Sequence, residues 1–94
     1  MTMFTIRVEL HDATWDDYTR LHAQLAARGI TDVVVSDQGV KYKMSPAEYN
    51  YVGVRTIDDV QQQAEAAARA VGKRHAVFTS EAVTRRWSGL QQVR

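Results

Sequence analysis

Residues 4–10 of this chain read FTIRVEL, a run in which every second side chain is apolar. Successive side chains of a β-strand point to opposite faces of a sheet, so this pattern indicates a strand with one buried face. The buried face would hold Phe4, Ile6, Val8 and Leu10. The other face would hold Thr5, Arg7 and Glu9. We therefore expect a sheet with one side open to solvent.

A helix is expected directly after this strand, from Trp15 to Arg28. Thr14 precedes it and offers a hydroxyl oxygen as an N-cap, and two aspartates fall in the first turn, where the helix dipole favours negative charge. Gly29 follows the last turn, as is common at helix C-termini. The residues that recur at helical spacing are Trp15, Tyr18, Leu21, His22 and Leu25.

The next part of the chain predicts a hairpin. Strands at 30–36 and 40–44 flank Asp37-Gln38-Gly39, whose late glycine suits a tight turn. In the second strand Lys41 and Lys43 should face solvent, because the opposite orientation would bury two lysines. Residues 45–55 are less regular and are expected to form an ordered loop or a strand extension.

The second half of the chain repeats the plan of the first. Thr56 caps a helix that ends at Gly72, and the apolar stripe of this helix is rich in alanine, which allows close packing on a sheet. A strand follows from His75 to Ser80. Its inward side chains are either Ala76 and Phe78 or Val77 and Thr79.

This order of elements predicts one α+β domain over residues 1–94. The expected fold is a ferredoxin-like β-α-β-β-α-β sandwich, with two helices on one face of a four-stranded antiparallel sheet and the first and third strands in its centre. Residues 82–94 form a C-terminal tail in which Trp87 and Leu90 dock and 91–94 fray.

Composition narrows the classes of function. The formal net charge is +1, so no global field draws the chain to nucleic acid or membrane, and any basic function depends on local clusters. The absence of cysteine removes disulfides and thiolate metal sites and fits a reducing compartment. No secretory signal or membrane-spanning run is present in the sequence. We expect a cytoplasmic protein with no cofactor, no resident metal and no membrane partner.

The junction His11-Asp12 is the first candidate site. A carboxylate at the end of a central strand is placed to act as a general base or, if a metal is used, as its ligand. Histidine is the usual general acid–base in metal-free RNA cleavage. The alternative is that Asp12 only bonds backbone amides in its turn.

Basic residues suggest an RNA-binding surface. Arg7, Lys41 and Lys43 would form a stripe on the open face of the central strands, where it can follow phosphates. The alternative is a solvated face or an oligomer contact. Base stacking on the sheet is not expected, because the positions on this face of the two central strands have no aromatic side chain.

Several short segments resemble a family of small bacterial proteins. They are VELHDATW at 8–15, Ala47-Glu48-Tyr49, Gly72-Lys73 and Ser80-Glu81-Ala82. The chain resembles the GhoS-like family, the endoribonuclease antitoxins of type V toxin–antitoxin systems. The resemblance implies an endoribonuclease that binds and cleaves a toxin messenger RNA. It also matches Asp12 to the aspartate that ends the first strand of small CRISPR-associated nucleases, and it suggests Arg28 as a further phosphate contact.

Two functions therefore stand as hypotheses. The first is a sequence-selective endoribonuclease antitoxin, in which Asp12 and His11 are catalytic and Arg7, Arg28, Lys41 and Lys43 bind RNA. The alternative is a non-catalytic module for protein–protein interaction or self-association. Either function is compatible with a homodimer, and DNA is not an expected partner.

Overall fold

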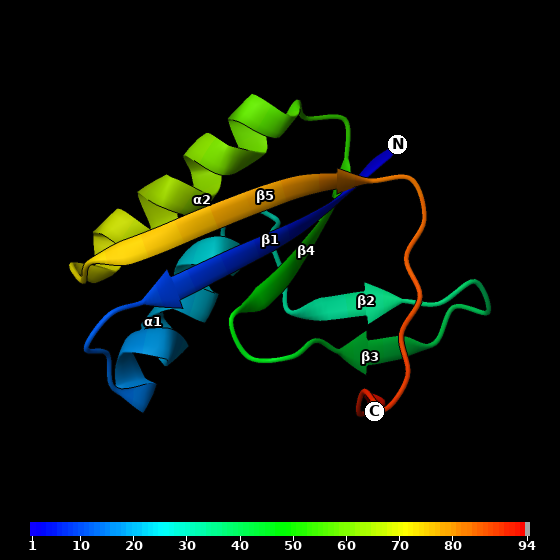
Figure 1. Cartoon of the computed structure of the whole chain (residues 1–94), viewed down its shortest axis with the longest axis horizontal. Helices are drawn as coiled ribbons and strands as arrows, with labels where there is room; N and C mark the ends of the chain where they lie inside the picture. Colours follow the sequence, from blue (N-terminus) through cyan, green and yellow to red (C-terminus); the bar gives the residue numbers. More distant parts are fainter. Residues whose placement is uncertain (94) are drawn as a thin grey trace.

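The computed structural model describes residues 1–93 of the chain and is a mixed α+β fold with two helices and two antiparallel sheets (Figure 1). A three-stranded sheet has the order β4-β1-β5, and β2 and β3 form a separate two-stranded sheet. In chain order the elements are β1 (Thr2–Leu10), α1 (Trp15–Ala26), β2 (Val33–Val35), β3 (Lys41–Lys43), β4 (Glu48–Gly53), α2 (Ile57–Val71) and β5 (His75–Ala82).

Strand β1 is the centre of the larger sheet, between β4 and β5. Its predicted alternation is confirmed, because Phe4, Ile6 and Val8 are fully buried while Arg7 and Glu9 are exposed. Fully burying one such apolar side chain stabilises the fold by about 1.5–3 kcal/mol. The buried face of β1 therefore supplies a large part of the core.

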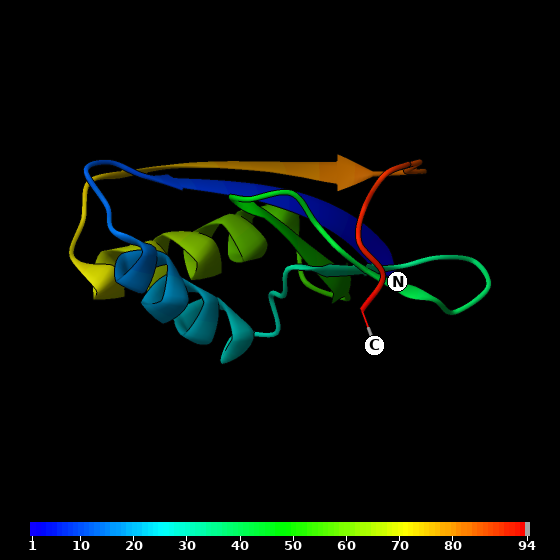
Figure 2. The same cartoon turned by 90° about the horizontal axis from the view of Figure 1, so that it is seen from below.

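Both helices lie on the same side of the larger sheet (Figure 2). Helix α1 begins after the predicted cap, with Asp17 N–H donating to Thr14 Oγ1 at 3.2 Å and Thr14 N–H donating to Asp17 Oδ2 at 2.9 Å. It ends at Ala26, before the predicted Arg28. Helix α2 begins after Thr56 and is closed by Gly72 at its C-cap, as predicted. Within residues 1–93, neither helix is long and apolar enough to cross a membrane.

Trp15 shares the helical spacing of Leu21 and Leu25 but not their burial. Its side chain is 83% exposed. The helix instead meets the core through Leu21 and Leu25, which lie further along it and are fully buried. As the first helical residue, Trp15 lies at the very end of that contact.

One of the two neighbours of β1 is β4, which lies within the segment that the sequence analysis left irregular. Residues Tyr49 and Tyr51 lie opposite Ile6 and Phe4 of β1, and Tyr49 is only 1% exposed. These rings alternate inward with period two, which gives β4 a large apolar face to bury. The predicted place of strand 40–44 in the centre of the sheet is wrong. The expected four-stranded sheet is replaced by a three-stranded sheet and a separate hairpin.

The hairpin is joined to the rest of the fold at two places. Thr31 and Asn50 exchange backbone hydrogen bonds of 2.9 and 2.6 Å, which connect the start of the hairpin to β4. At the other side, Lys43 N–H donates to Gln91 O and Val93 N–H donates to Lys41 O, both at 2.8 Å. The predicted fraying is therefore wrong for residues 91–93, and residue 94 lies outside the described part of the chain.

Strand β5 settles the choice of inward face that the sequence left open. Val77 packs against the core, and Thr79 Oγ1 donates to Gln61 Oε1 of α2 at 2.6 Å. Phe78 therefore points to the open side of the sheet, where it is 68% exposed.

Candidate functional site

The pairing of β1 with β5 places a basic segment beside the predicted catalytic pair. His11 N–H donates to Arg74 O at 2.8 Å, and Arg74 Nη2 lies 3.6 Å from Asp12 Oδ2. The side chains of Asp12 and Arg74 are 89% and 82% exposed, so the ion pair is open to solvent. Asp12 has a φ of 53°, a left-handed conformation that aspartate tolerates in turns. We call His11, Asp12 and Arg74 the corner of the sheet.

The corner contains groups for acid–base and phosphate chemistry. An exposed guanidinium binds phosphate oxygens through several donors, and an imidazole exchanges protons near neutral pH. Residues 1–93 contain no group of three or more histidine, aspartate or glutamate side chains placed to hold a metal ion.

His75 is a further histidine near the corner that was not among the predicted site residues. It lies opposite Leu10, next to the bond between His11 and Arg74. Its Nδ1 is 2.9 Å from Lys73 O. Because a carbonyl oxygen only accepts, this contact is a hydrogen bond when Nδ1 has the proton.

Asp17 lies close to the corner but has a structural role. Its carboxylate accepts from Thr14 N–H, pairs closely with Arg20, and lies 3.7 Å from Lys73 Nζ. The hydrogen bond from the Thr14 backbone, helped by Arg20, lowers the pKa of Asp17. The carboxylate is buried and fully engaged, so it does not serve a substrate.

The four predicted phosphate contacts do not gather around the corner. Lys41 and Lys43 are exposed but belong to β3, in the separate sheet. Arg28 follows the C-terminal end of α1, whereas Asp12 precedes its N-terminal end. The helix has 12 residues and so spans about 18 Å. Arg28 Nη1 donates to Gln24 O at 2.8 Å, which holds its side chain on the helix end.

Arg7 is the predicted contact that lies on β1, the strand that leads into the corner. It is on the open side of β1, in a loose ion pair with Glu9 whose atoms are 3.6 Å apart. Its cross-strand neighbour is Phe78 of β5. The exposed ring and the guanidinium therefore lie side by side on the open face.

Phe78 is the functional candidate that sequence reasoning missed. In residues 75–80 the even and the odd positions both include apolar side chains. Alternation alone therefore does not show which set of positions faces the core. The expectation that the open face has no aromatic side chain was made for the two central strands only, and Phe78 lies on β5, at the edge of the sheet. The open face therefore has one ring on which a base can stack.

The tail approaches the same face at the start of β1. Arg85 Nη1 lies 3.4 Å from Phe4 O and 3.3 Å from Thr5 Oγ1. Arg7, Phe78 and Arg85 therefore lie on the open side of the sheet, and the corner lies at the far end of β1.

Comparison of the chain with known protein families finds no matching family, and comparison with curated proteins finds no match.

Proposed function

We propose that this protein binds single-stranded RNA on the open face of the β4-β1-β5 sheet and cleaves it at the corner. The observation behind the proposal is the pairing of Phe78, 68% exposed, with Arg7 across the strands. Proteins that hold single strands stack bases on exposed aromatic rings and neutralise the phosphates with basic side chains. A phenylalanine that is 68% exposed on the open face of a sheet contributes little to the core, which favours a binding role.

The proposed cleavage uses the 2′-hydroxyl of the RNA as the nucleophile. His11 accepts the proton of this hydroxyl while its oxygen bonds to the adjacent phosphorus. The bond from phosphorus to the 5′-oxygen breaks, and that oxygen takes a proton from water or from a protonated imidazole. The products are a 2′,3′-cyclic phosphate and a free 5′-hydroxyl. Arg74 stabilises the charge on the phosphoryl oxygens, and Asp12 orients Arg74 or replaces His11 as the base.

The resemblance to the GhoS-like family suggests a biological role for this activity. The protein would act in the cytoplasm as an antitoxin that cleaves a toxin messenger RNA. We further infer a variant of the ferredoxin-like fold, with β5, β1 and β4 as three strands of the sheet. The isolated bridge between Thr31 and Asn50 supports this inference, because Thr31 lies two residues before β2 and Asn50 belongs to β4.

Binding is tested with the Phe78→Ala variant and a fluorescently labelled single-stranded RNA. Loss of one base–aromatic stack is expected to weaken binding about tenfold, since such stacks contribute about 1–3 kcal/mol. The matched control is Val54→Ala, which shortens an apolar side chain that is 88% exposed and lies outside the strands. Equal affinity of the Phe78→Ala and Val54→Ala variants would exclude the open face as the binding surface.

Cleavage is tested separately with mixed RNA, in the presence and absence of EDTA. We expect cleavage by the unmodified protein to persist in EDTA and to be lost in the His11→Ala, Asp12→Asn double variant. Circular dichroism checks that the variant is folded, which is expected because both side chains are exposed. An unchanged rate in the double variant would remove both residues from the mechanism.

A second candidate is self-association through β5. This strand pairs with β1 on one side only, and edge strands readily add a further strand. Phe78 and Val83, which are 68% and 96% exposed, lie on or directly after it. Sedimentation of the unmodified and Phe78→Ala proteins discriminates the two functions. A dimer that the substitution dissociates, together with absence of RNA binding, would favour self-association.

A further inference from the structure

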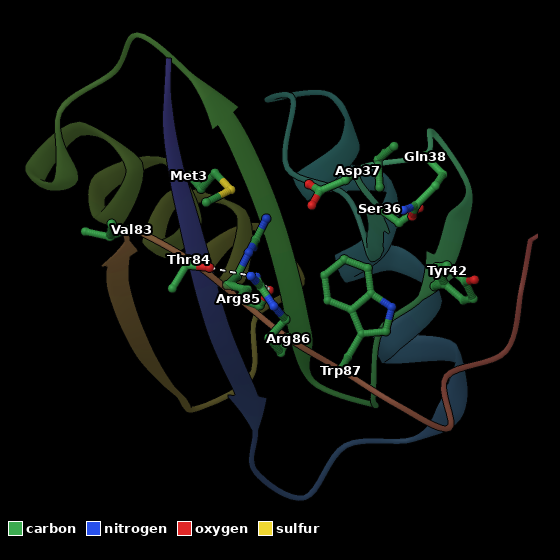
Figure 3. A pocket seen from close by; sticks show the side chains of 11 residues that line it. Met3, Ser36, Asp37, Gln38, Tyr42, Val83, Thr84, Arg85, Arg86 and Trp87 are labelled. Carbon is green, nitrogen blue, oxygen red and sulfur yellow. Dashed lines mark hydrogen bonds between the residues drawn. The ribbon is translucent and has the colours of Figure 1, made fainter.

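A hollow of about 490 Å³ lies between the start of β1, the hairpin and the tail (Figure 3). Drug-sized ligands typically occupy sites of roughly 300–1,000 Å³. The hollow lies at the opposite end of β1 from the corner, and this strand of nine residues is about 30 Å long. Any ligand bound in the hollow would therefore lie far from His11 and Asp12.

Two guanidinium groups line the hollow. Arg85 has an inaccessible Nε with no hydrogen-bond partner, and its Nη1 makes only the two long contacts to β1. Burial lowers the pKa of Arg85. Arg86 is exposed, and its Nη1 is held by Thr84 Oγ1 at 2.7 Å and Arg85 O at 2.8 Å.

Neither arginine forms an ion pair with a carboxylate of residues 1–93. A partly buried cation without a counter-charge or full hydrogen bonding is destabilising, and an anionic ligand relieves that cost. Two adjacent guanidiniums suit the several oxygens of a phosphate group.

The other wall of the hollow is aromatic. The rings of Trp87 and Tyr42 make an edge-to-face pair, with centroids 5.9 Å apart and an interplanar angle of 63°. Figure 3 shows the indole ring of Trp87 face-on, between the two arginines and the hairpin residues. Asp37 and Gln38 line the same space from the hairpin turn and offer oxygen acceptors.

We propose that this hollow binds one nucleotide, with its phosphate at Arg85 and Arg86 and its base against Trp87. Inorganic phosphate alone would leave the aromatic wall uncovered, and an apolar ligand would leave both cations unpaired. Asp37 and Gln38 are placed to accept from the ribose hydroxyls or from an exocyclic amine of the base. The site goes beyond the proposed RNA cleavage and does not depend on it.

Two sources supply the same chemistry: a free mononucleotide and a nucleotide within an RNA strand. The first test uses the Trp15→Phe protein, in which Trp87 is the only tryptophan. Trp15 is 83% exposed and outside the hollow, so the fold should be unaffected. The fluorescence emission of Trp87 is then measured in the presence of AMP, UMP, uridine, inorganic phosphate or a short single-stranded RNA.

We expect AMP and UMP to quench Trp87 and uridine to have much less effect, because uridine has no phosphate. Inorganic phosphate should compete with the mononucleotides without quenching. Quenching by the RNA but not by mononucleotides would assign the hollow to a nucleotide within a strand. Absence of quenching by any nucleotide or RNA at millimolar concentration would overturn the proposal.

The second test removes the phosphate contacts. In the Trp15→Phe background, Arg86→Ala and Arg85→Gln should each weaken binding about tenfold, as expected for loss of charged hydrogen bonds. Arg69→Ala is the matched control, because it removes an exposed arginine from α2, which does not line the hollow. Because Arg86 is exposed, its replacement should not unfold the chain. Equal nucleotide affinity of the Arg86→Ala and Arg69→Ala proteins would also overturn the proposal.

Failure of this site is distinguishable from failure of RNA binding on the sheet. Phe78 does not line the hollow, so Phe78→Ala should leave quenching by mononucleotides unchanged while it weakens RNA binding. Loss of mononucleotide binding in Phe78→Ala would contradict a separate site.

Discussion

The carboxylate of Asp17 joins three parts of the chain. It completes the cap of α1 with Thr14, pairs with Arg20 on the same helix, and approaches Lys73 in the turn before β5. Arg20 Nη1 also contacts Val71 O at 3.5 Å, at the end of α2. The position of the corner therefore depends on a buried residue that does not itself meet the substrate.

Asp17 should make the stability of the protein sensitive to acid. Its pKa is lowered in the folded state, chiefly by the Thr14 backbone hydrogen bond, so the unfolded chain binds the proton more readily. The contribution is present above the ordinary aspartate pKa and is lost as pH falls through the lower folded value. Asp17→Asn should destabilise the protein near neutral pH and flatten the acid side of its stability profile.

Thermal unfolding over a range of pH checks this expectation. Asp16→Asn is the matched control, because it removes an exposed carboxylate from the same helical turn and leaves the capping box intact. If stability falls as steeply with decreasing pH in the Asp17→Asn protein as in the Asp16→Asn protein, the acid sensitivity comes from a group other than Asp17.

Tyr49, in contrast to Asp17, has a buried polar atom that does not contribute to the stability of the core. Its ring packs edge-on against His22, with centroids 5.4 Å apart, but its hydroxyl is buried without a hydrogen-bond partner. Burial accordingly raises the pKa of Tyr49. Tyr49→Phe should leave the free energy of unfolding unchanged or increase it by about 1 kcal/mol, measured in urea. A clear loss of stability would reveal a partner for the hydroxyl.

At the scale of elements, the difference between β3 and β4 explains which strands could be predicted. Tyr42 is the one aromatic side chain within β3, whose other two residues are lysines, whereas β4 turns Tyr49 and Tyr51 toward the core. Both segments alternate in sequence. Local alternation identifies a strand but not its neighbour, because the choice of partner depends on the total apolar surface buried across the sheet.

The tail is an element that the sequence did not reveal. Its residues Gln91–Val93 form backbone hydrogen bonds with β3, although nothing in their composition distinguishes them from a frayed end. A protein that ends at Leu90 should show faster amide hydrogen exchange at Lys43, whose N–H donates to Gln91 O. The amides of β1 serve as internal controls. Unchanged protection at Lys43 would show that the hairpin is stable without the tail.

For the whole molecule, the net charge of +1 hides an uneven distribution of basic groups. Arg7, Arg85, Arg86 and Arg74 lie along β1 from the hollow to the corner, and acidic partners are paired only with Arg7 and Arg74. A strand of RNA that follows this path would contact about four cations.

This path predicts a measurable dependence of RNA binding on salt. Contact with four phosphates gives a slope of about −3 for log K against log salt, since each contact on a single strand contributes about −0.7. Arg7→Ala should reduce the steepness by about 0.7. Fluorescence anisotropy between low and physiological salt measures both values. A slope near zero would support a protein partner in place of RNA.

The sequence predicted the helices, their caps and the buried face of β1 well, because these depend on residues close together in the chain. It identified His11 and Asp12 as a junction but not their neighbour Arg74, which reaches them through the pairing of β1 with β5. The hollow was also hidden, because its walls come from residues about fifty positions apart. The RNA contacts assigned to Lys41 and Lys43 depended on a strand order that the structure does not have.

The bond from Val93 to Lys41 also affects the order in which the protein is made. During translation the residues of β3 are synthesised long before Gln91–Val93, so β3 lacks its second partner until almost the entire described chain has been made. Pairing between residues so distant in the chain is slow to form. The nucleotide site in the hollow should consequently form after the sheet, and a released chain that ends at Ala82 would have the strands of the open face but not the hollow.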